Sequence, residues 1–126
     1  MSLMTPLNRV LGLGTAKGAA EHWWLQRVTA IALLPLGLWL AYALLTLPGF
    51  DYASVTAWVQ QPVTSILLIL LVVAISYHSA LGVQVVIEDY VPGNGMKAAT
   101  LVASTLAHVA LGVAAAFAVL KIAFGS

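Results

Sequence analysis

Residues 63–95 read VTSILLILLVVAISYHSALGVQVVIEDYVPGNG, and this stretch decides the fold. Val63 to Ile87 is a run of twenty-five residues without Asp, Glu, Lys or Arg. As an α-helix the run would extend ~37 Å at ~1.5 Å per residue, enough to cross a hydrocarbon core of ~30 Å. It contains one histidine, His78, and ends at two acids, a tyrosine and a Pro-Gly turn. The stretch therefore predicts a membrane-spanning helix with an ionisable group in its middle and a polar end.

The composition extends this interpretation to the whole chain. Of the 126 residues, 62% are hydrophobic and 7% are charged. A soluble domain carries about 25% charged residues, so this chain has too few charges to cover a water-facing surface. The net charge of +1 is too small to indicate a nucleic-acid partner, and the absence of cysteine excludes disulfides and thiolate ligands within the chain. We expect a single membrane-anchor domain, residues 1–126.

Three segments are predicted to span the membrane, which makes the fold all-α and integral to the membrane. They lie at about residues 25–47, 63–88 and 97–124. Residues 1–24 are expected to form a cytoplasmic or interfacial segment, because Trp23 and Trp24 at its end are typical of a membrane interface. Pro35 should bend the first span, since proline lacks an N–H and clashes with the preceding turn.

Basic residues near the span ends predict the orientation. Arg9, Lys17 and Arg27 precede the first span and Lys97 lies between the second and third, whereas the first connector has no Lys or Arg. The N-terminus should therefore face the cytoplasm, or the mitochondrial matrix, and the C-terminus the opposite side. Only Lys121, which snorkels at the end of the third span, departs from this pattern.

Two histidines are predicted to lie near mid-membrane, where ionisable groups are functional candidates. His78 is followed by Gly82 on the same helix face, which leaves room for a flat group. His78-Ser-Ala-Leu-Gly-Val also matches His108-Val-Ala-Leu-Gly-Val, so the two histidines could clamp one haem iron within this chain. The alternative for His78 is a neutral imidazole bonded to a neighbouring helix. The small residues around His108 favour a packing role for it.

Polar residues at one membrane face are the other candidates. Arg27 either fixes the topology or binds an anion such as a haem propionate. The Tyr90 hydroxyl, beside Asp89, can donate to a quinone carbonyl, or it can simply anchor the helix end at the interface. Acids at a helix C-terminus are disfavoured by the macrodipole, which favours a functional role. The sequence has no phosphate loop, nucleophile–base pair or closed zinc set, so electron or proton transfer in a membrane is the expected chemistry.

At these residues the chain resembles the hydrophobic membrane-anchor subunits, the D subunits, of succinate dehydrogenase, which is respiratory complex II. One segment is EHWWLQRVTA at residues 21–30, and the other is His78-x3-Gly82 followed by Glu88-Asp89-Tyr90-Val91. Both occur at the matching spacing in a three-span chain of this length. The resemblance implies a subunit that does not itself oxidise succinate but passes electrons from succinate to ubiquinone.

The resemblance also implies roles for individual residues. His78 is the axial ligand to the iron of a haem b that is shared with a partner subunit, which supplies the second histidine. Arg27 matches a basic residue near the propionates. His22 matches a propionate contact, although some members place that histidine one residue earlier, where this chain has a glutamate. Tyr90 matches the tyrosine that hydrogen-bonds ubiquinone, and Asp89 matches its neighbouring acid.

The partners implied are a cytochrome b556 anchor subunit, an iron–sulfur subunit and a flavoprotein subunit. The location implied is the bacterial inner membrane or, alternatively, the mitochondrial inner membrane. Three other functions stay open: a self-contained cytochrome b that uses His78 and His108, an anchor of fumarate reductase, and a non-redox helical scaffold. Since both candidate sites are half-sites, we expect the protein to act only together with a partner chain.

Overall fold

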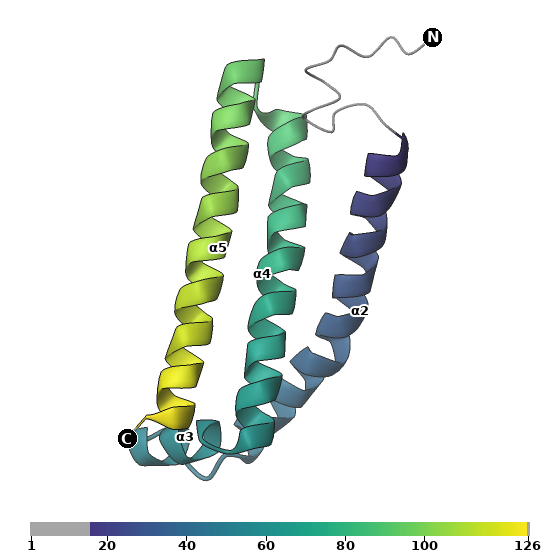
Figure 1. The fold of residues 1–126 in the computed structure, drawn as a ribbon. Coiled ribbons are helices and arrows are strands. Elements are labelled where there is room, and N and C mark those ends of the chain that lie inside the picture. Colours follow the sequence, from purple (N-terminus) through teal and green to yellow (C-terminus); the bar gives the residue numbers. More distant parts are fainter. Residues whose placement is uncertain (1–15, 126) are drawn as a thin grey trace.

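The computed structural model describes residues 16–125, which form four α-helices and no strand (Figure 1). The helices are α2 (Ala16–Thr46), α3 (Tyr52–Val59), α4 (Pro62–Tyr90) and α5 (Asn94–Phe124). Three of them are long and apolar enough to cross a membrane, at Gly18–Thr46, Pro62–Tyr90 and Asn94–Phe124. The all-α fold with three spans is therefore confirmed. The expectations for residues 1–15, Arg9 among them, lie outside the described residues.

The first helix is longer than the expected span, and the connector after it contains a helix that the sequence analysis did not anticipate. α2 begins at Ala16, so residues 16–24 are helical and continuous with the first span. Asp51 caps α3: its carboxylate accepts from the Ser54 hydroxyl at 2.7 Å and from the Ser54 N–H at 3.1 Å. These two bonds, the hydroxyl bond first, lower the pKa of Asp51.

α4 is the central helix of the bundle. It contacts the other three helices of the described chain, whereas α2 and α5 do not contact each other. Figure 1 shows α4 and α5 side by side and antiparallel, while α2 runs obliquely to them and curves along its second half. Pro35 lies in that half, and its missing N–H and its ring account for the curvature.

Few side chains are buried within this chain alone. Those that are buried among the described residues are Val59, Thr64, Ser65, Leu81 and Ile87. By contrast, Leu45 and Phe124 are 87% and 88% exposed. A helix that is apolar on all sides needs an apolar environment on all sides, so these outer faces must contact lipid or another membrane chain.

The two ends of the bundle differ in chemistry. The start of α2 and the turn between α4 and α5 lie at one end, and α3 and the C-terminus lie at the other (Figure 1). At the first end, Lys97 Nζ donates to the Glu88 carbonyl at 2.7 Å, and Gln84 Nε2 donates to Glu88 Oε1 at 2.8 Å. The lysine thereby caps the last turn of α4 and offsets the unfavourable position of its acids.

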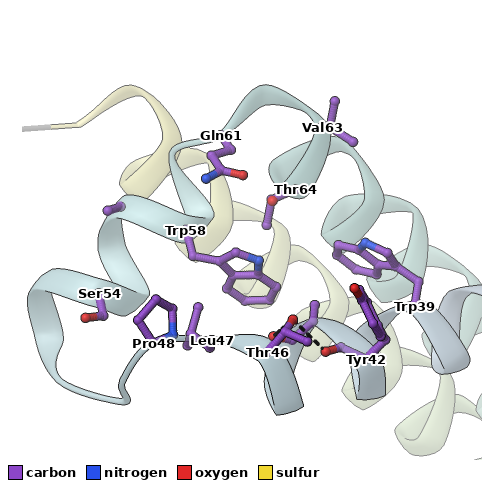
Figure 2. Close-up of a pocket in the computed structure, with 12 residues that line it drawn as sticks. Trp39, Tyr42, Thr46, Leu47, Pro48, Ser54, Trp58, Gln61, Val63 and Thr64 are labelled. Atoms are coloured by element: carbon purple, nitrogen blue, oxygen red, sulfur yellow. Dashed lines mark hydrogen bonds between the residues drawn. The ribbon is translucent and has the colours of Figure 1, made fainter.

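A cavity of about 560 Å³ lies at the α3 end (Figure 2). The indole rings of Trp39 and Trp58 stack beside it, with centroids 6.1 Å apart and planes at 21°. The Trp58 ring therefore packs against α2, whereas Tyr52 is 87% exposed. The aromatic pair joins α3 to the first span.

The turn before α5 depends on a glycine with a left-handed backbone. Gly93 has φ +78°, whereas Gly95 has open space around its Cβ position. We expect Gly93→Ala to destabilise the protein by ~1 kcal/mol, because an L side chain is strained at this φ. Gly95→Ala is the matched control and should not lower stability. Thermal unfolding in detergent, followed by circular dichroism, measures both, and equal loss in the two variants would contradict the assignment.

Candidate functional site

His78 lies on the face of α4 that packs against α2. Its Nδ1 is 3.0 Å from the hydroxyl oxygen of Thr29. One turn further on, a Cβ at Gly82 would lie 3.8 Å from Gln26 Nε2, which is ordinary contact. The His78–Gly82 face therefore contacts polar groups of α2.

A cavity of about 630 Å³ lies beside His78. Its lining residues are Arg27, Ala30, Ile31, Leu33, Leu34, Gly37, Leu38 and His78. The walls are apolar except for one imidazole and one guanidinium. A site of this kind can take a large apolar group that carries a metal for the imidazole and an anionic substituent for the arginine.

Arg27 is held at the mouth of this cavity by Trp23. Its Cζ lies 5.0 Å from the centroid of the Trp23 ring, within the range of a cation–π contact. A cation–π contact is not a hydrogen bond, so it does not use up the guanidinium N–H donors. No hydrogen bond or ion pair joins these donors to another described residue, so they are available to an anion.

His22 lies on the face of α2 that carries Gln26 and Thr29 and packs against α4. It is five residues before Arg27, which is a rotation of about 140° around the helix, and it shares its face with Gln26. The His22 Nε2 and Gln26 Oε1 atoms are buried and have no hydrogen-bond partner among the described residues. His22 does not line the His78 cavity. Arg27 therefore lines the same cavity as His78, whereas His22 lies nearer the start of α2 on its α4-facing side.

His108 is fully engaged in hydrogen bonds. Its Nδ1 lies 2.7 Å from the Ser104 carbonyl, which can only accept, so Nδ1 carries the proton. Its Nε2 then accepts from the Ser79 hydroxyl of α4 at 3.1 Å. Neither nitrogen is left for a metal. This pattern supports the packing role of His108 and argues against the self-contained cytochrome with His78 and His108 as ligands.

Asp89 and Tyr90 lie in the last turn of α4 and point away from the bundle's own contacts. Both are exposed, Tyr90 by 81%, and neither side chain is hydrogen-bonded to another described residue. Neither lines the His78 cavity. They form a second, separate candidate site whose polar atoms are free to bind a ligand or a partner chain.

Sequence reasoning missed two residues that the structure brings to the histidines, Thr29 and Ser79. Thr29 lies within the EHWWLQRVTA segment, and Ser79 directly follows His78. A hydroxyl inside an otherwise apolar span was the available signal, since such groups commonly bond across helices. No group of three or more His, Asp or Glu side chains that could hold a metal ion occurs within residues 16–125.

Comparisons with known proteins give one consistent result. A family described as succinate dehydrogenase/fumarate reductase transmembrane subunit matches residues 1–120. A succinate dehydrogenase hydrophobic membrane anchor subunit of Rickettsia bellii is 39% identical over 93 residues, which are 74% of this chain and 74% of the relative. The subunit of that name in Paracoccus denitrificans is 27% identical over 126 residues, 100% of this chain and 97% of the relative. A succinate dehydrogenase membrane anchor subunit of Reclinomonas americana is 30% identical over 90 residues, 69% and 75% of the two chains.

The Ser79–His108 bond should stabilise the pairing of α4 and α5. We expect Ser79→Ala to destabilise the protein by roughly 0.6 kcal/mol, the mean for interhelical hydrogen bonds in membranes. Ser65→Ala is the matched control, because the Ser65 hydroxyl bonds only the Gln61 and Pro62 carbonyls near the start of its own helix. Thermal unfolding in detergent compares the two variants. A control that is destabilised as much as Ser79→Ala would refute the interhelical role.

Proposed function

The chain belongs to the family of succinate dehydrogenase/fumarate reductase transmembrane subunits, as a membrane anchor subunit of succinate dehydrogenase, and from this premise we propose what its two candidate sites bind. The His78 cavity holds one face of a haem b. Tyr90 and Asp89 hold the headgroup of ubiquinone. A partner anchor subunit completes both sites, and electrons from succinate pass to the quinone.

The single observation that carries the haem proposal is the environment of His78. Thr29 occupies its Nδ1, its Nε2 makes no hydrogen bond to a described residue, and the adjoining cavity is apolar. An imidazole whose second nitrogen is fixed by a hydrogen bond is the usual arrangement of a metal-ligating histidine. The residues present therefore fit a haem ligated through Nε2, which supplies one-electron chemistry when bound.

Arg27 takes the propionate end of that haem. It lies two residues, or ~3 Å of helix, before Thr29, and its free donors suit a carboxylate. The aliphatic side chains of Ala30, Ile31 and Leu34 exclude water from the remaining walls. Arg27 lines the His78 cavity and His22 does not, so we assign this contact to Arg27.

The quinone site uses the exposed end of α4. The Tyr90 hydroxyl donates to a quinone carbonyl, orients the headgroup and polarises it for reduction, and Asp89 lies beside it at the aqueous boundary. Reduction to the quinol consumes two electrons, supplied by succinate oxidation in the soluble subunits, and two protons, which enter from the water at this end. The relatives are succinate dehydrogenase subunits, which supports succinate oxidation as the direction.

The complex is arranged accordingly. A flavoprotein and an iron–sulfur subunit dock at the end that carries Tyr90, and the second anchor chain covers the exposed apolar faces. From the distribution of basic residues, we orient this end and the N-terminus toward the cytoplasmic side of a bacterial inner membrane.

The haem assignment is tested by His78→Ala. We expect the assembled complex to lose its haem b, because no other imidazole on the described part of this chain has a free nitrogen near the cavity. His108→Gln is the control and should leave the reduced-minus-oxidised spectrum unchanged. Haem content per complex, measured by the pyridine haemochrome method, shows whether His78→Ala loses the haem and His108→Gln keeps it. Full haem with an unchanged spectrum in His78→Ala would remove the ligand assignment.

The quinone assignment is tested by Tyr90→Phe. We expect succinate:quinone reductase activity to fall by roughly 2- to 13-fold, which corresponds to one hydrogen bond of ~0.5–1.5 kcal/mol. Succinate oxidation with a soluble artificial acceptor should be unaltered, because that reaction does not reach this chain. Tyr52→Phe, at the opposite end and equally exposed to its surroundings, is the control. Unchanged quinone reduction in Tyr90→Phe would argue for an anchoring role only.

A further inference from the structure

Thr29 is the described residue that contacts His78 through a side-chain hydrogen bond across the α2–α4 interface. Its hydroxyl oxygen lies 3.0 Å from His78 Nδ1. The same oxygen lies 2.8 Å from the Leu25 carbonyl and 3.1 Å from the Gln26 carbonyl of its own helix. The group is therefore shared between the backbone of α2 and the imidazole of α4.

The positions of the hydrogen atoms follow from these three contacts. A threonine hydroxyl has one proton to donate, and both carbonyl oxygens can only accept. Donation to the Leu25 carbonyl, the shortest of the three contacts, is the placement that also leaves the threonine oxygen as an acceptor for His78. The contact with His78 is then a hydrogen bond in which Nδ1–H donates to the threonine oxygen. A neutral His78 in this arrangement carries its free lone pair on Nε2.

The threonine thereby selects the tautomer that can bind a metal through Nε2. The opposite tautomer would leave the Thr29 oxygen with no donor from His78 and would place a proton on the nitrogen that faces the ligand. The ring is also fixed in rotation, because the hydroxyl oxygen is itself held against the backbone of α2. Replacing that oxygen by a methyl group removes both effects with little change in volume.

We propose that Thr29 is a positioning residue for the haem of this chain, an inference that rests on the proposed haem ligation by His78. Thr29 sets the His78 tautomer and ring orientation, and its acceptor oxygen raises the basicity of the imidazole. A more basic ligand stabilises the oxidised iron, so Thr29 also lowers the reduction potential of the haem. The residue touches neither iron nor quinone and acts only through His78.

The test compares three variants in the intact complex. Thr29→Val keeps the shape and removes the hydroxyl, and Thr29→Ser keeps the hydroxyl. Thr105→Val is the matched control, because the Thr105 hydroxyl bonds only the Leu101 carbonyl of its own helix. Redox titration of the haem absorption gives the midpoint potential, and haem content at limiting haem supply gives the relative affinity.

We expect Thr29→Val to bind haem about 10- to 100-fold more weakly, the usual effect of losing a group that orients a metal ligand. The haem that remains should have a more positive midpoint potential. Thr29→Ser should restore both values, and Thr105→Val should leave both unchanged. A Thr29→Val complex with the content and potential of the unaltered complex would overturn the proposal, as would a Thr29→Ser complex that behaves like the valine variant.

A second measurement needs no variant. A cryo-electron microscopy structure of the unaltered complex is expected to show the Thr29 hydroxyl within hydrogen-bond distance of His78 Nδ1 while Nε2 faces the iron. A threonine turned away from the ring would overturn the proposal.

The two proposals fail separately. If the His78→Ala complex keeps its haem, the proposed ligation fails and this inference fails with it. If His78→Ala loses its haem but Thr29→Val changes neither haem content nor potential, only the role of Thr29 fails.

Discussion

A polar group inside a hydrocarbon layer must find its hydrogen-bond partners within protein, and this constraint arranges the three long helices. Apolar side chains gain little from packing against each other rather than against lipid. The contacts that can hold the bundle in one arrangement are therefore the few polar ones. Thr29 with His78 joins α2 to α4, and Ser79 with His108 joins α5 to α4. Because both bonds converge on neighbouring residues of α4, that helix lies between the other two.

The two histidines are used differently because of this geometry. His108 has both ring nitrogens bonded within the bundle, so it contributes to helix pairing alone. His78 has one nitrogen bonded, lines a cavity and has a second nitrogen that bonds no described residue, so it is fixed in place and still able to bind a ligand. Consecutive positions on α4 point ~100° apart, which separates the two faces. Around these contacts lie the exposed apolar surface and three side chains without a hydrogen bond to a described residue, those of Arg27, Asp89 and Tyr90. These groups are available to the other subunits of the complex.

Much of the fold was predictable from the sequence, because a charge-free run of the right length has few alternatives. The Pro92–Gly95 turn and the positions of the spans followed from local chemistry. The helix α3 and the start of α2 at Ala16 did not, since short or interfacial helices lack a strong hydrophobic signal. The roles of the histidines could not be separated from spacing alone, because the HSALGV and HVALGV segments match. Each histidine bonds a hydroxyl on the facing helix, and what distinguishes them is the second ring nitrogen, which bonds the Ser104 carbonyl in His108 and no described residue in His78. The spacing of the sequence does not show this difference.

The central claim is that this chain holds half of a haem site around His78. Native mass spectrometry of the complex, extracted from its own membrane with lipid retained, tests that claim most directly. The account predicts an assembly of this chain with a second membrane chain and two soluble subunits, whose mass exceeds that of the polypeptides, the flavin and the iron–sulfur clusters by one haem b. An intact assembly whose mass is explained by its polypeptides, flavin, iron–sulfur clusters and lipids, with no haem, would contradict it.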